Sequence, residues 1–461
     1  MADTFDVRIW SIKPRVNKDG KTTSYQVVWR VGPERFYETF KKKAPADGFR
    51  SKLFSAQNRG EPFDTRTGLP ASMRRPEQDV PWFDLACDYV EMKWPDAAAT
   101  ARQTVAEALI RVAPVFLKQV KGRPSDRAIR STLRGWAFNP DKRAQGMPVD
   151  VKERFEWCSR NSLPVSVALN SDVLDTLERA VTTNLSGGKY APSVARKTRS
   201  VLSNFLAYAV RRGALESNPL PETKWSTMPK GNRTIDPRTV PNPVQARTLL
   251  AAVRGVQRSG PRLEAFFGTM YHAALRPEEV AALRENNLDL PRKGWGTIYV
   301  ESADPHAGKH WTGTDRAREH RGVKARGDDE GRPVPCSPEL VGLLRSHLAK
   351  YGSGADGLVF TGAQGEDVPK ITYMRVWRVA RQAAFTSDVA SSRLARRPYS
   401  LRHAAVSAWL AAGVDPATVA RWAGHSVAVL LEIYAACLHG QDVVARQRVE
   451  EFFGYHQEGS P

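Results

Sequence analysis

One proline-dense stretch constrains this chain more than any other feature, because no helix can continue through it. Residues 218–243, "NPLPETKWSTMPKGNRTIDPRTVPNP", contain six prolines. Proline lacks a backbone N–H and disfavours helical geometry in the residue before it. A second polar segment, 61–80, is rich in Pro, Gly and Arg and also reads as a linker. We therefore predict three domains and a C-terminal tail, over residues 1–60, 81–217, 244–440 and 441–461.

Residues 1–60 predict a small β-rich domain. Three runs of β-branched and aromatic residues, "FDVRIWSI", "TTSYQVVWRV" and "RFYETFK", are separated by turn-rich text. The domain holds 13 Lys and Arg against 6 Asp and Glu. We expect a three-stranded sheet that binds DNA in a groove, with Lys41, Lys42 and Lys43 as contacts. An ordinary basic surface with no partner is the alternative.

Residues 81–217 predict an α-helical domain, because apolar residues recur there every three or four positions. The last helix, "VARKTRSVLSNFLAYAVRRGAL", places Arg196, Lys197 and Arg199 on its outer side. These three are candidate DNA contacts, although such charges are often only solvated. The predicted buried side of this helix consists of Val201, Leu202, Phe205, Ala209 and Val210.

The third domain predicts a mixed α/β fold. It opens with helices at "VQARTLLAAVRGV" and "PRLEAFFGTMYHAAL", followed by a strand at "GTIYVES". A long polar excursion leads to a second strand around "RPVPC", and helices follow to the end. The expected fold class is therefore mostly α with small β elements, in several domains.

The charge balance indicates a polyanionic partner. The chain has 69 Lys and Arg against 49 Asp and Glu, a formal net charge of +20. Nucleic acid is the first expectation and an anionic membrane the second. No run of 18 apolar residues is present to span a bilayer, and the N-terminus does not resemble a signal peptide. We expect a cytoplasmic, nucleoid-associated protein without membrane attachment.

Several other classes of site are disfavoured by the sequence. The four cysteines, Cys87, Cys158, Cys336 and Cys437, are scattered and form no C-x-x-C pair, so neither a zinc site nor a disulfide framework is predicted. The motifs GxxxxGK[ST], GxGxxG after a strand and HExxH are absent. We therefore expect neither nucleotide hydrolysis nor metalloprotease chemistry, and no cofactor or metal.

Polar residues interrupt the apolar stretch 399–438, "YSLRHAAVSAWLAAGVDPATVARWAGHSVAVLLEIYAACL". Gly413 and Gly424 predict helix ends, and Asp415 followed by proline predicts a helix start. Arg402 then opens one helix, His425 lies in a turn, and Tyr434 lies near the end of the last helix. Taken singly, each has a structural explanation, such as an ion pair, a capped helix end or core packing.

Taken together, these polar residues favour a different interpretation. With a second arginine stretch further upstream, they resemble the tyrosine recombinase, or phage integrase, family. The family's first arginine box reads roughly L-R-x-x-E and matches Arg276 and Glu279 in "ALRPEEVAAL". Its second box reads H-x-L-R-H and matches Arg402 and His403 in "YSLRHAAVS". A G-H-S step then precedes a tyrosine nine residues after the histidine.

In this chain the G-H-S histidine is His425 and the tyrosine nine residues later is Tyr434. The family's lysine lies on a β-hairpin before an R-x-VP strand, which points to Lys324 ahead of "GRPVP", with Lys309 as a competitor. One position departs from the family: Tyr399 stands where the leading histidine of the second box is usual. A phenol donates hydrogen bonds but is a poor base near pH 7, so a slower enzyme or another proton acceptor is expected.

The resemblance implies a function and roles for these residues. Two arginines, Arg276 and Arg402, would hold the charge that builds on a DNA phosphate, and Tyr434 would attack it to form a 3′-phosphotyrosine. Lys324 would protonate the departing 5′-oxygen. His425 would contact the phosphate, and Glu279 would orient the arginine side. Tyr399 and His403 complete the supporting group.

The expected protein is a site-specific recombinase that integrates or excises a mobile element. Its expected partners are double-stranded DNA at attachment sites, further copies of the chain in a tetramer on paired DNA, and accessory DNA-bending or excision factors. The resemblance also implies that residues 1–60 bind arm-type sites and 81–217 bind the core site. A type IB topoisomerase shares the Arg/Lys/His/Tyr chemistry and is one alternative. A DNA-binding regulator with weakened catalysis, suggested by Tyr399, is the other.

Overall fold

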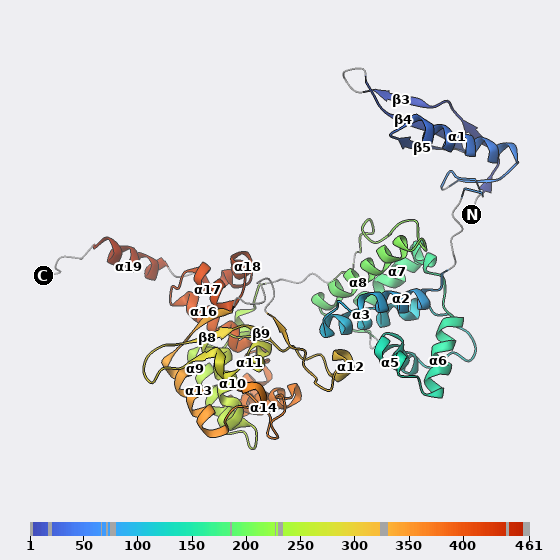
Figure 1. Cartoon of the computed structure of the whole chain (residues 1–461). Coiled ribbons are helices and arrows are strands. Elements are labelled where there is room, and N and C mark those ends of the chain that lie inside the picture. The colour runs from blue at the N-terminus through green and yellow to red at the C-terminus, as the bar shows by residue number, and fades with distance from the viewer. Residues whose placement is uncertain are drawn as a thin grey trace.

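The computed structural model of the chain describes residues 3–16, 21–65, 67–70, 72–73, 80–184, 187–225, 227–228, 234–322, 331–438 and 442–454. It is mostly helical with small antiparallel sheets, which confirms the predicted fold class (Figure 1). Over these residues, no helix is long and apolar enough to cross a bilayer. We call the three parts the N-terminal body (3–73), the helical body (80–228) and the C-terminal body (234–438).

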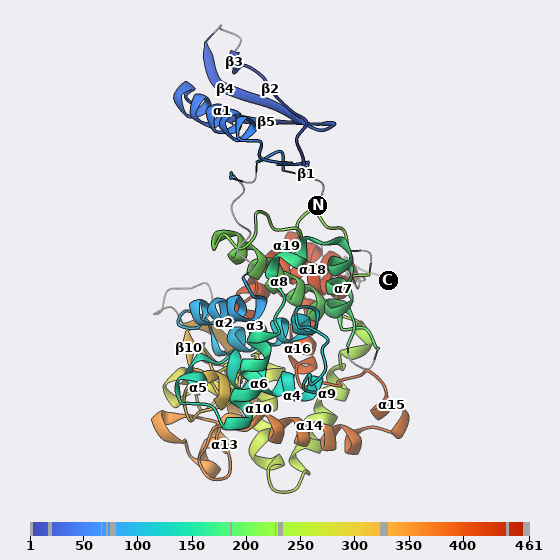
Figure 2. The same cartoon turned by 90° about the vertical axis from the view of Figure 1, so that its right-hand side faces the viewer.

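The N-terminal body is a four-stranded sheet covered on one face by a helix. The long strand β4 lies in the centre, with β5 along one edge and β2 and β3 along the other. Val27, Trp29 and Val31 of β4 pack with Leu53 of helix α1 in a separate core, apart from the other bodies in Figure 2. The elements are β1 (Asp3–Thr4), β2 (Val7–Ile9), β3 (Lys13–Val16), β4 (Thr22–Val31), β5 (Glu34–Phe40), α1 (Lys43–Asn58) and β6 (Phe63–Asp64).

The three strands predicted for this part all form, but the structure adds a fourth strand to their sheet, the short separate pair β1 and β6, and a helix. Strand β3 forms in residues that were predicted to be a turn. Helix α1 was not predicted, because Pro45 and Gly48 weaken its helical pattern. Pro45 lies in the first turn, where its missing N–H breaks no helical hydrogen bond. The predicted linker 61–80 is also partly wrong: Phe63 is buried in this core, and Nε1 of Trp29 donates to the carbonyl of Gly68 at 2.5 Å.

The helical body forms from every run that was predicted to be helical. At its centre Trp82 stacks on Phe116 with ring centroids 5.1 Å apart, and Phe205 meets the same indole edge-on. On α8, Leu202, Phe205 and Ala209 are buried as expected, whereas Val201 and Val210 are only half-buried. The elements are α2 (Trp82–Lys93), α3 (Ala99–Val112), α4 (Asp126–Thr132), a π-helical turn (Leu133–Ala137), α5 (Pro140–Ala144), α6 (Val149–Arg160), α7 (Ser171–Thr182) and α8 (Pro192–Arg211).

The C-terminal body packs helices around a three-stranded antiparallel sheet of order β11-β8-β7. The strands predicted at "GTIYVES" and "RPVPC" are β8 and β11, with Arg332 paired opposite Val300. The elements are α9 (Pro243–Arg254), α10 (Gly260–His272), α11 (Pro277–Ala282), β7 (Leu288–Asp289), β8 (Gly296–Val300), β9 (Ser302–Ala303), α12 (Lys309–Thr312), β10 (Arg321–Gly322), β11 (Arg332–Cys336), α13 (Pro338–Tyr351), α14 (Lys370–Ala384), α15 (Ser387–Ser391), α16 (Ser400–Ala411), α17 (Pro416–Ala423), α18 (Val427–Leu438) and, beyond the body, α19 (Asp442–Phe453).

Two connections join the helical and C-terminal bodies. The predicted linker 218–243 holds only one short 3-10 turn in its described part, but its ends are packed: Trp225 lies against the helical core and Ile235 against the cluster that contains Tyr434. The second connection is residues 304–320, which we call the arm. It leaves the C-terminal body between β9 and β10 and carries α12 to the helical body, as Figure 1 shows.

Candidate active site

Arg276 and Glu279 form the first half of the site at the start of α11. Pro277 occupies the first helical position, so Arg276 precedes the helix and Glu279 falls in its first turn. The Glu279 carboxylate accepts the backbone N–H of Arg276 at 2.8 Å and Nη1 of the same residue at 2.7 Å. Nη2 of Arg276 donates to the carbonyl of Gly424 at 3.0 Å. The three-residue spacing of the pair thus fixes the guanidinium at the surface of the C-terminal body.

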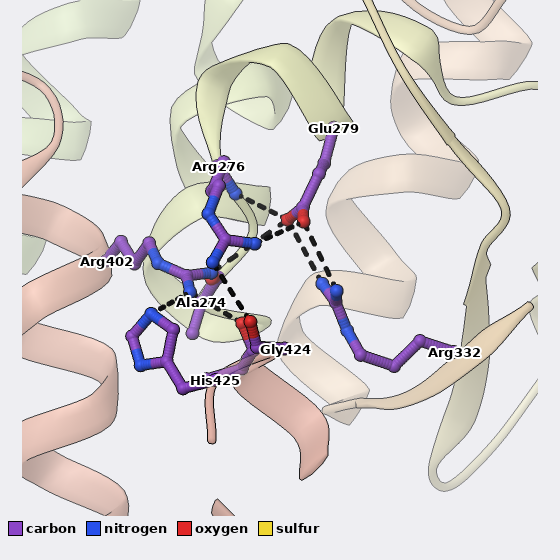
Figure 3. A network of polar contacts seen from close by, with 8 residues as sticks. Ala274, Arg276, Glu279, Arg332, Arg402, Gly424 and His425 are labelled. Atoms are coloured by element: carbon purple, nitrogen blue, oxygen red, sulfur yellow. Dashed lines mark hydrogen bonds and ion pairs between the residues drawn. The ribbon is translucent and has the colours of Figure 1, made fainter. Parts of the chain in front are cut away.

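Arg402 reaches the same carboxylate from another helix. It lies in the first turn of α16 and is 0% exposed. Its guanidinium donates to the carbonyls of Ala274 and Ala423, and its Nη1 lies 3.9 Å from Oε2 of Glu279 (Figure 3). Ala274 adopts a φ of 51°, which is unusual outside glycine and aims its carbonyl at Arg402. Two arginines that are 126 residues apart in sequence therefore meet at Glu279.

A third arginine, Arg332, was not predicted as a member of the site. It stands on β11 with 1% exposure and donates from Nη1 and Nη2 to Oε1 and Oε2 of Glu279, at 3.2 and 3.0 Å (Figure 3). The stretch "RPVPC" predicted only a strand. An arginine that alternates with the buried Val334 and Cys336 on one face of a strand was the available signal.

The cluster has an excess of positive charge and of hydrogen-bond donors. The guanidinium groups of Arg332, Arg276 and Arg402 outweigh burial and lower the pKa of Glu279 to about 2, so that its carboxylate is ionised. Three guanidinium groups thus share one carboxylate. Buried nitrogens of Arg402 (Nε), Arg332 (Nε) and His425 (Nδ1) have no hydrogen-bond partner among the described residues. Such a site has more donors than its one carboxylate can accept from and is suited to bind a further anion.

His425 follows Gly424, which ends α17 in the left-handed conformation with a φ of 65°, while Asp415 caps the start of that helix as predicted. Nε2 of His425 accepts from Nη2 of Arg402 at 2.8 Å. Burial together with Arg402 and Arg276 lowers the pKa of His425 to about 3, so the ring is neutral at pH 7. Its Nδ1 then carries the proton and is available as a donor.

Tyr434 lies beside the two histidines. Its side chain on α18 is 1% exposed and its ring stacks with that of His425, with centroids 6.3 Å apart. The hydroxyl of Tyr434 lies 2.8 Å from Nδ1 of His403, which is one residue beyond Arg402 on α16. Tyr399, at the start of α16, meets the ring of His403 edge-on at 5.0 Å. All members of the predicted supporting group thus gather at this corner.

The two candidate lysines have different positions. Lys324 lies outside the described residues, two positions after strand β10 ends. Lys309 is exposed at the first position of α12, on the arm, rather than on the β9–β10 hairpin. The next residues of that helix, His310 and Trp311, contact the helical body. The choice between Lys324 and Lys309 therefore stays a prediction.

A cleft of about 1160 Å³ separates the helical body from this corner. It is lined by Lys197 of α8, the N-terminal turns of α3, Arg276, and Arg321 of β10. Arg196 is also exposed on α8, as predicted. Arg199 is not: it donates to the carbonyls of Leu220 and Thr223 and lies over the ring of Trp225, so its role is structural.

Lys41, Lys42 and Lys43 are exposed where β5 leads into α1, on the N-terminal body. Within the described ranges, no group of three or more His, Cys, Asp or Glu side chains is arranged to hold a metal ion.

The chain is similar in sequence to a family model and to several known proteins. Residues 242–439 match the family model described as the Phage integrase family. The chain is similar to tyrosine recombinase XerC of Mycobacterium sp. (strain KMS), 26% identical over 298 residues, which covers 62% of this chain and 84% of that protein. It is similar to tyrosine recombinase XerD of Lacticaseibacillus casei, 26% identical over 260 residues, covering 55% and 75%. A solved structure, the Tn1549 transposon integrase in complex with a circular intermediate DNA, aligns at 17% identity with a TM-score of 0.49, covering 67% of this chain and 96% of that one.

Proposed function

The chain belongs to the phage integrase family of tyrosine recombinases, and we propose that it cuts and rejoins DNA at specific sites to integrate or excise a mobile element. One observation carries this proposal. The guanidinium groups of Arg276 and Arg402 meet at Glu279, 2.7 and 3.9 Å from its carboxylate oxygens, with His425 and Tyr434 alongside.

The excess positive charge of this corner suits a DNA phosphodiester. Arg276 and Arg402 would donate to the non-bridging oxygens, where negative charge builds during attack. Preplaced donors of this kind contribute roughly 2.7–4 kcal/mol each to transition-state stabilisation. Nδ1 of His425, a buried donor without a partner among the described residues, would add a third hydrogen bond.

Tyr434 would supply the nucleophile. Its phenolic oxygen would bond to phosphorus while the bond from phosphorus to the 5′-oxygen breaks, leaving a 3′-phosphotyrosine and a free 5′-hydroxyl. Lys324 would give a proton to that 5′-oxygen. The phosphotyrosine keeps the energy of the original ester, so the 5′-hydroxyl of another strand can reverse the step without ATP.

The cleft between the helical and C-terminal bodies is the proposed seat of the duplex. It places Lys197, Arg276 and Arg321 on shared walls. Binding by phosphate contacts of this kind releases counterions, so affinity should fall steeply with salt, with a slope of about −0.9 per phosphate neutralised.

The N-terminal body supports a second DNA contact. Arg8, Arg30 and Arg35 lie opposite one another across β2, β4 and β5. They point away from α1, because the neighbours of Arg30 on β4, Trp29 and Val31, face the core. Asp6 pairs with Arg30 at 3.0 Å. Three like charges on neighbouring strands still leave an excess of positive charge, which a polyanion on this face would offset. We propose that this face and Lys41–Lys43 bind arm-type DNA sites.

Assembly into a tetramer on paired DNA is part of the proposal. Helix α19 exposes Val449, Phe452 and Phe453, which are 51%, 85% and 62% exposed. Exposed aromatic side chains at the end of a helix are suited to a protein partner, and a second copy of the chain is the expected one. Accessory DNA-bending or excision factors are expected to act on the same assembly.

A nicked suicide substrate tests the proposal. The wild-type chain should form a covalent protein–DNA adduct that survives denaturing electrophoresis, and Tyr434→Phe should form none. A plasmid carrying two sites should recombine, whereas a type IB topoisomerase would only relax it. If the wild-type chain binds the site but forms no adduct, it would instead be a DNA-binding regulator. Tyr399, which replaces the usual histidine, is the reason to test this alternative.

A further inference from the structure

We propose that His403 accepts the proton of Tyr434 during strand cleavage, an inference that rests on the proposed function. The observation behind it is the 2.8 Å separation between Nδ1 of His403 and the hydroxyl oxygen of Tyr434. A general base has to lie within hydrogen-bond reach of the proton that it takes. His403 provides this contact from α16, and its imidazole, unlike a guanidinium, has a lone pair that can take a proton.

The fold holds the imidazole of His403 in place from both sides. The backbone N–H of His403 donates to the carbonyl of Tyr399 at 3.3 Å, and the Tyr399 ring packs edge-on against the imidazole at 5.0 Å. The Tyr434 ring lies on the other side, with centroids 5.8 Å apart. The base and the nucleophile are thus positioned by packing between α16 and α18 rather than by substrate.

The charge state of His403 agrees with this role. Burial and the adjacent Arg402 guanidinium lower its pKa to about 4, so the ring is neutral at pH 7 and one nitrogen keeps a lone pair. A phosphodiester bound to Arg276 and Arg402 would offset their positive field and raise that pKa again. The imidazole would therefore become a stronger base once DNA is bound.

The phenolic O–H of Tyr434 breaks, its oxygen bonds to phosphorus, and the proton moves to Nδ1 of His403, whose Nε2 already carries a hydrogen. The 5′-oxygen leaves with a proton from the general acid. In the joining step the 5′-hydroxyl attacks phosphorus and returns its proton to the general acid. The bond from phosphorus to the phenolic oxygen breaks, and the departing phenolate takes its proton back from Nδ1.

This assignment accounts for the departure at position 399. The histidine that is usual there in the family is replaced by Tyr399, a phenol that is a poor base near pH 7. Tyr399 and Tyr434 contact the same imidazole. The proton-accepting group has therefore moved along α16 from position 399 to position 403.

Single-turnover adduct formation on the nicked substrate tests the role. His403→Ala should slow adduct formation by ~10²–10⁴-fold, the range of general base catalysis, with unchanged noncovalent affinity for DNA. Free imidazole should restore part of the rate in His403→Ala. Tyr399→His should restore part of it too, because it returns a histidine to the family position. His347→Gln, which changes another buried histidine away from this corner, is the matched control and should leave the rate unchanged.

The variant His403→Gln separates loss of the base from loss of packing. Glutamine keeps a hydrogen bond to Tyr434 but accepts no proton. It should unfold at the same temperature as wild type and be as slow as His403→Ala. A rate within threefold of wild type for His403→Gln, or no rescue of His403→Ala by imidazole and Tyr399→His, would overturn the assignment. If wild type forms no adduct that depends on Tyr434, the proposed function itself fails.

The arm carries a second, independent inference: the geometry points to Trp311 as a positioning residue that holds the helical body over the cleft before DNA arrives. Trp311 is 2% exposed, and it and Ala307 are the members of the helical core that come from the C-terminal body. Its ring centroid lies 6.2 Å from that of Trp94. Arg102 of α3 donates to the Trp311 carbonyl at 3.2 Å and lies over the Trp94 ring.

Polar contacts surround this anchor. Asn139, 1% exposed, donates to the carbonyl of His310 at 2.7 Å, and the His310 ring contacts the carbonyl of Arg134 at 2.9 Å. At the other end of the arm, the Glu319 carboxylate accepts the backbone N–H of Ala99 at 3.0 Å. This carboxylate lies at the N-terminus of α3, where the helix dipole favours negative charge.

The base of the arm is fixed to the C-terminal body. Arg318, 5% exposed, donates to the carbonyls of Asp304 and Val368 at 2.8 and 2.9 Å. The backbone N–H of Asp304 donates to the carbonyl of Glu278, which is adjacent to Glu279. Both ends of the arm also line the cleft, through Pro305 and the neighbouring Arg321. The arm therefore connects the walls of the cleft in the absence of DNA.

A cleft whose walls are already in place binds with less loss of freedom. Trp311→Ala should therefore raise the concentration of DNA that half-saturates adduct formation by about tenfold or more, while the rate at saturating DNA stays within twofold. Small-angle X-ray scattering of the DNA-free variant should show a larger radius of gyration. Trp295→Ala is the matched control, because Trp295 is 65% exposed on the C-terminal body.

The double variant His310→Ala/Glu319→Gln loosens the arm without removing a core side chain, and should shift half-saturation in the same direction. Unchanged or tighter DNA binding by both arm variants would overturn the inference, as would an unchanged scattering curve for Trp311→Ala. Scattering needs no catalysis, so it tests the arm even if the proposed function fails.

Discussion

Arg332 and Glu279 form a two-point ion pair in which neither side chain is more than 2% exposed, with Nη–Oε distances of 3.2 and 3.0 Å. The pair lies behind Arg276 and Arg402 and holds the carboxylate that both of them contact. The positions of the two guanidinium groups that we propose to bind phosphate therefore depend on a third arginine, which is only 1% exposed.

Replacing Arg332 should cost more stability than replacing an exposed arginine. Arg332→Met leaves the buried carboxylate without its two-point partner, and we expect a loss of about 3 kcal/mol in the free energy of unfolding. Arg254→Met, which breaks the exposed pair with Glu264, should cost roughly 0–1 kcal/mol. Urea denaturation measures both. Equal costs would show that Arg332 does not support the site.

Acid should weaken the fold through Glu279. Its pKa in the fold is lowered from 4.5 to about 2, so its contribution to stability is fully present above pH 4.5 and is lost as the pH falls from 4.5 towards 2. Glu279→Gln should remove this part of the pH dependence. The measurement is the difference in free energy of unfolding between wild type and variant at several pH values. A difference that stays constant below pH 4.5 would contradict the assignment.

Gly424 should not tolerate a side chain. A Cβ there would lie 2.2 Å from Nη1 of Arg332, and its φ of 65° already disfavours other residues. Gly424→Ala should therefore displace the arginine cluster and reduce adduct formation at least tenfold. Gly213→Ala has a similar φ of 74° with no heavy atom within 4 Å of its Cβ, so it should cost only the strain, ~1 kcal/mol. Adduct assays and thermal unfolding of both variants separate the two effects.

The arginine row of the N-terminal sheet should set the salt dependence of arm-site binding. Arg35→Gln removes one member of the row, and the slope of log K against log salt should fall by about 0.9 if that arginine contacts one phosphate. Lys52→Gln on the exposed side of α1 is the control and should leave the slope unchanged. The measurement is DNA binding by fluorescence anisotropy over a salt series. A larger effect of Lys52 would place the DNA on the helix instead.

Variants of Lys324 and Lys309 should differ in adduct formation on a substrate whose leaving group needs no general acid. Lys324→Ala should lose adduct formation on normal DNA and regain it when the leaving 5′-oxygen is replaced by sulfur, because a thiolate leaves without a proton. Lys309→Ala should behave like wild type on both substrates, since Lys309 lies on the arm. If the sulfur substrate instead restores adduct formation to Lys309→Ala, then Lys309 is the general acid and Lys324 is not.

Short-range patterns predicted the parts of the site that depend on short spacing. The family's first arginine box pointed to Arg276 and Glu279, and helix-end chemistry predicted the caps of α17; the structure has both where expected. Arg332 and Trp311 were missed for one physical reason. Each is defined by a partner far away in sequence: Glu279 for Arg332, and Trp94 for Trp311.

The same reason explains the helix α1, which was read as the end of a β unit. Its own pattern is weak, and it is held by packing Leu53 against Trp29 and its neighbours on β4. Arg199 shows the opposite error: its place on the outer side of α8 was predicted correctly, but Trp225 from the following segment covers it.

The contact between Trp94 and Trp311 limits how this protein could be recombined with its relatives. A chimera that takes its helical body from one homologue and its C-terminal body from another would pair an indole with a surface that did not evolve beside it. Residues 304–320 would have to come from the same homologue as the helical body, although they lie within the sequence of the C-terminal body. Engineers who wish to retarget this protein should therefore treat the arm as part of the module that they exchange.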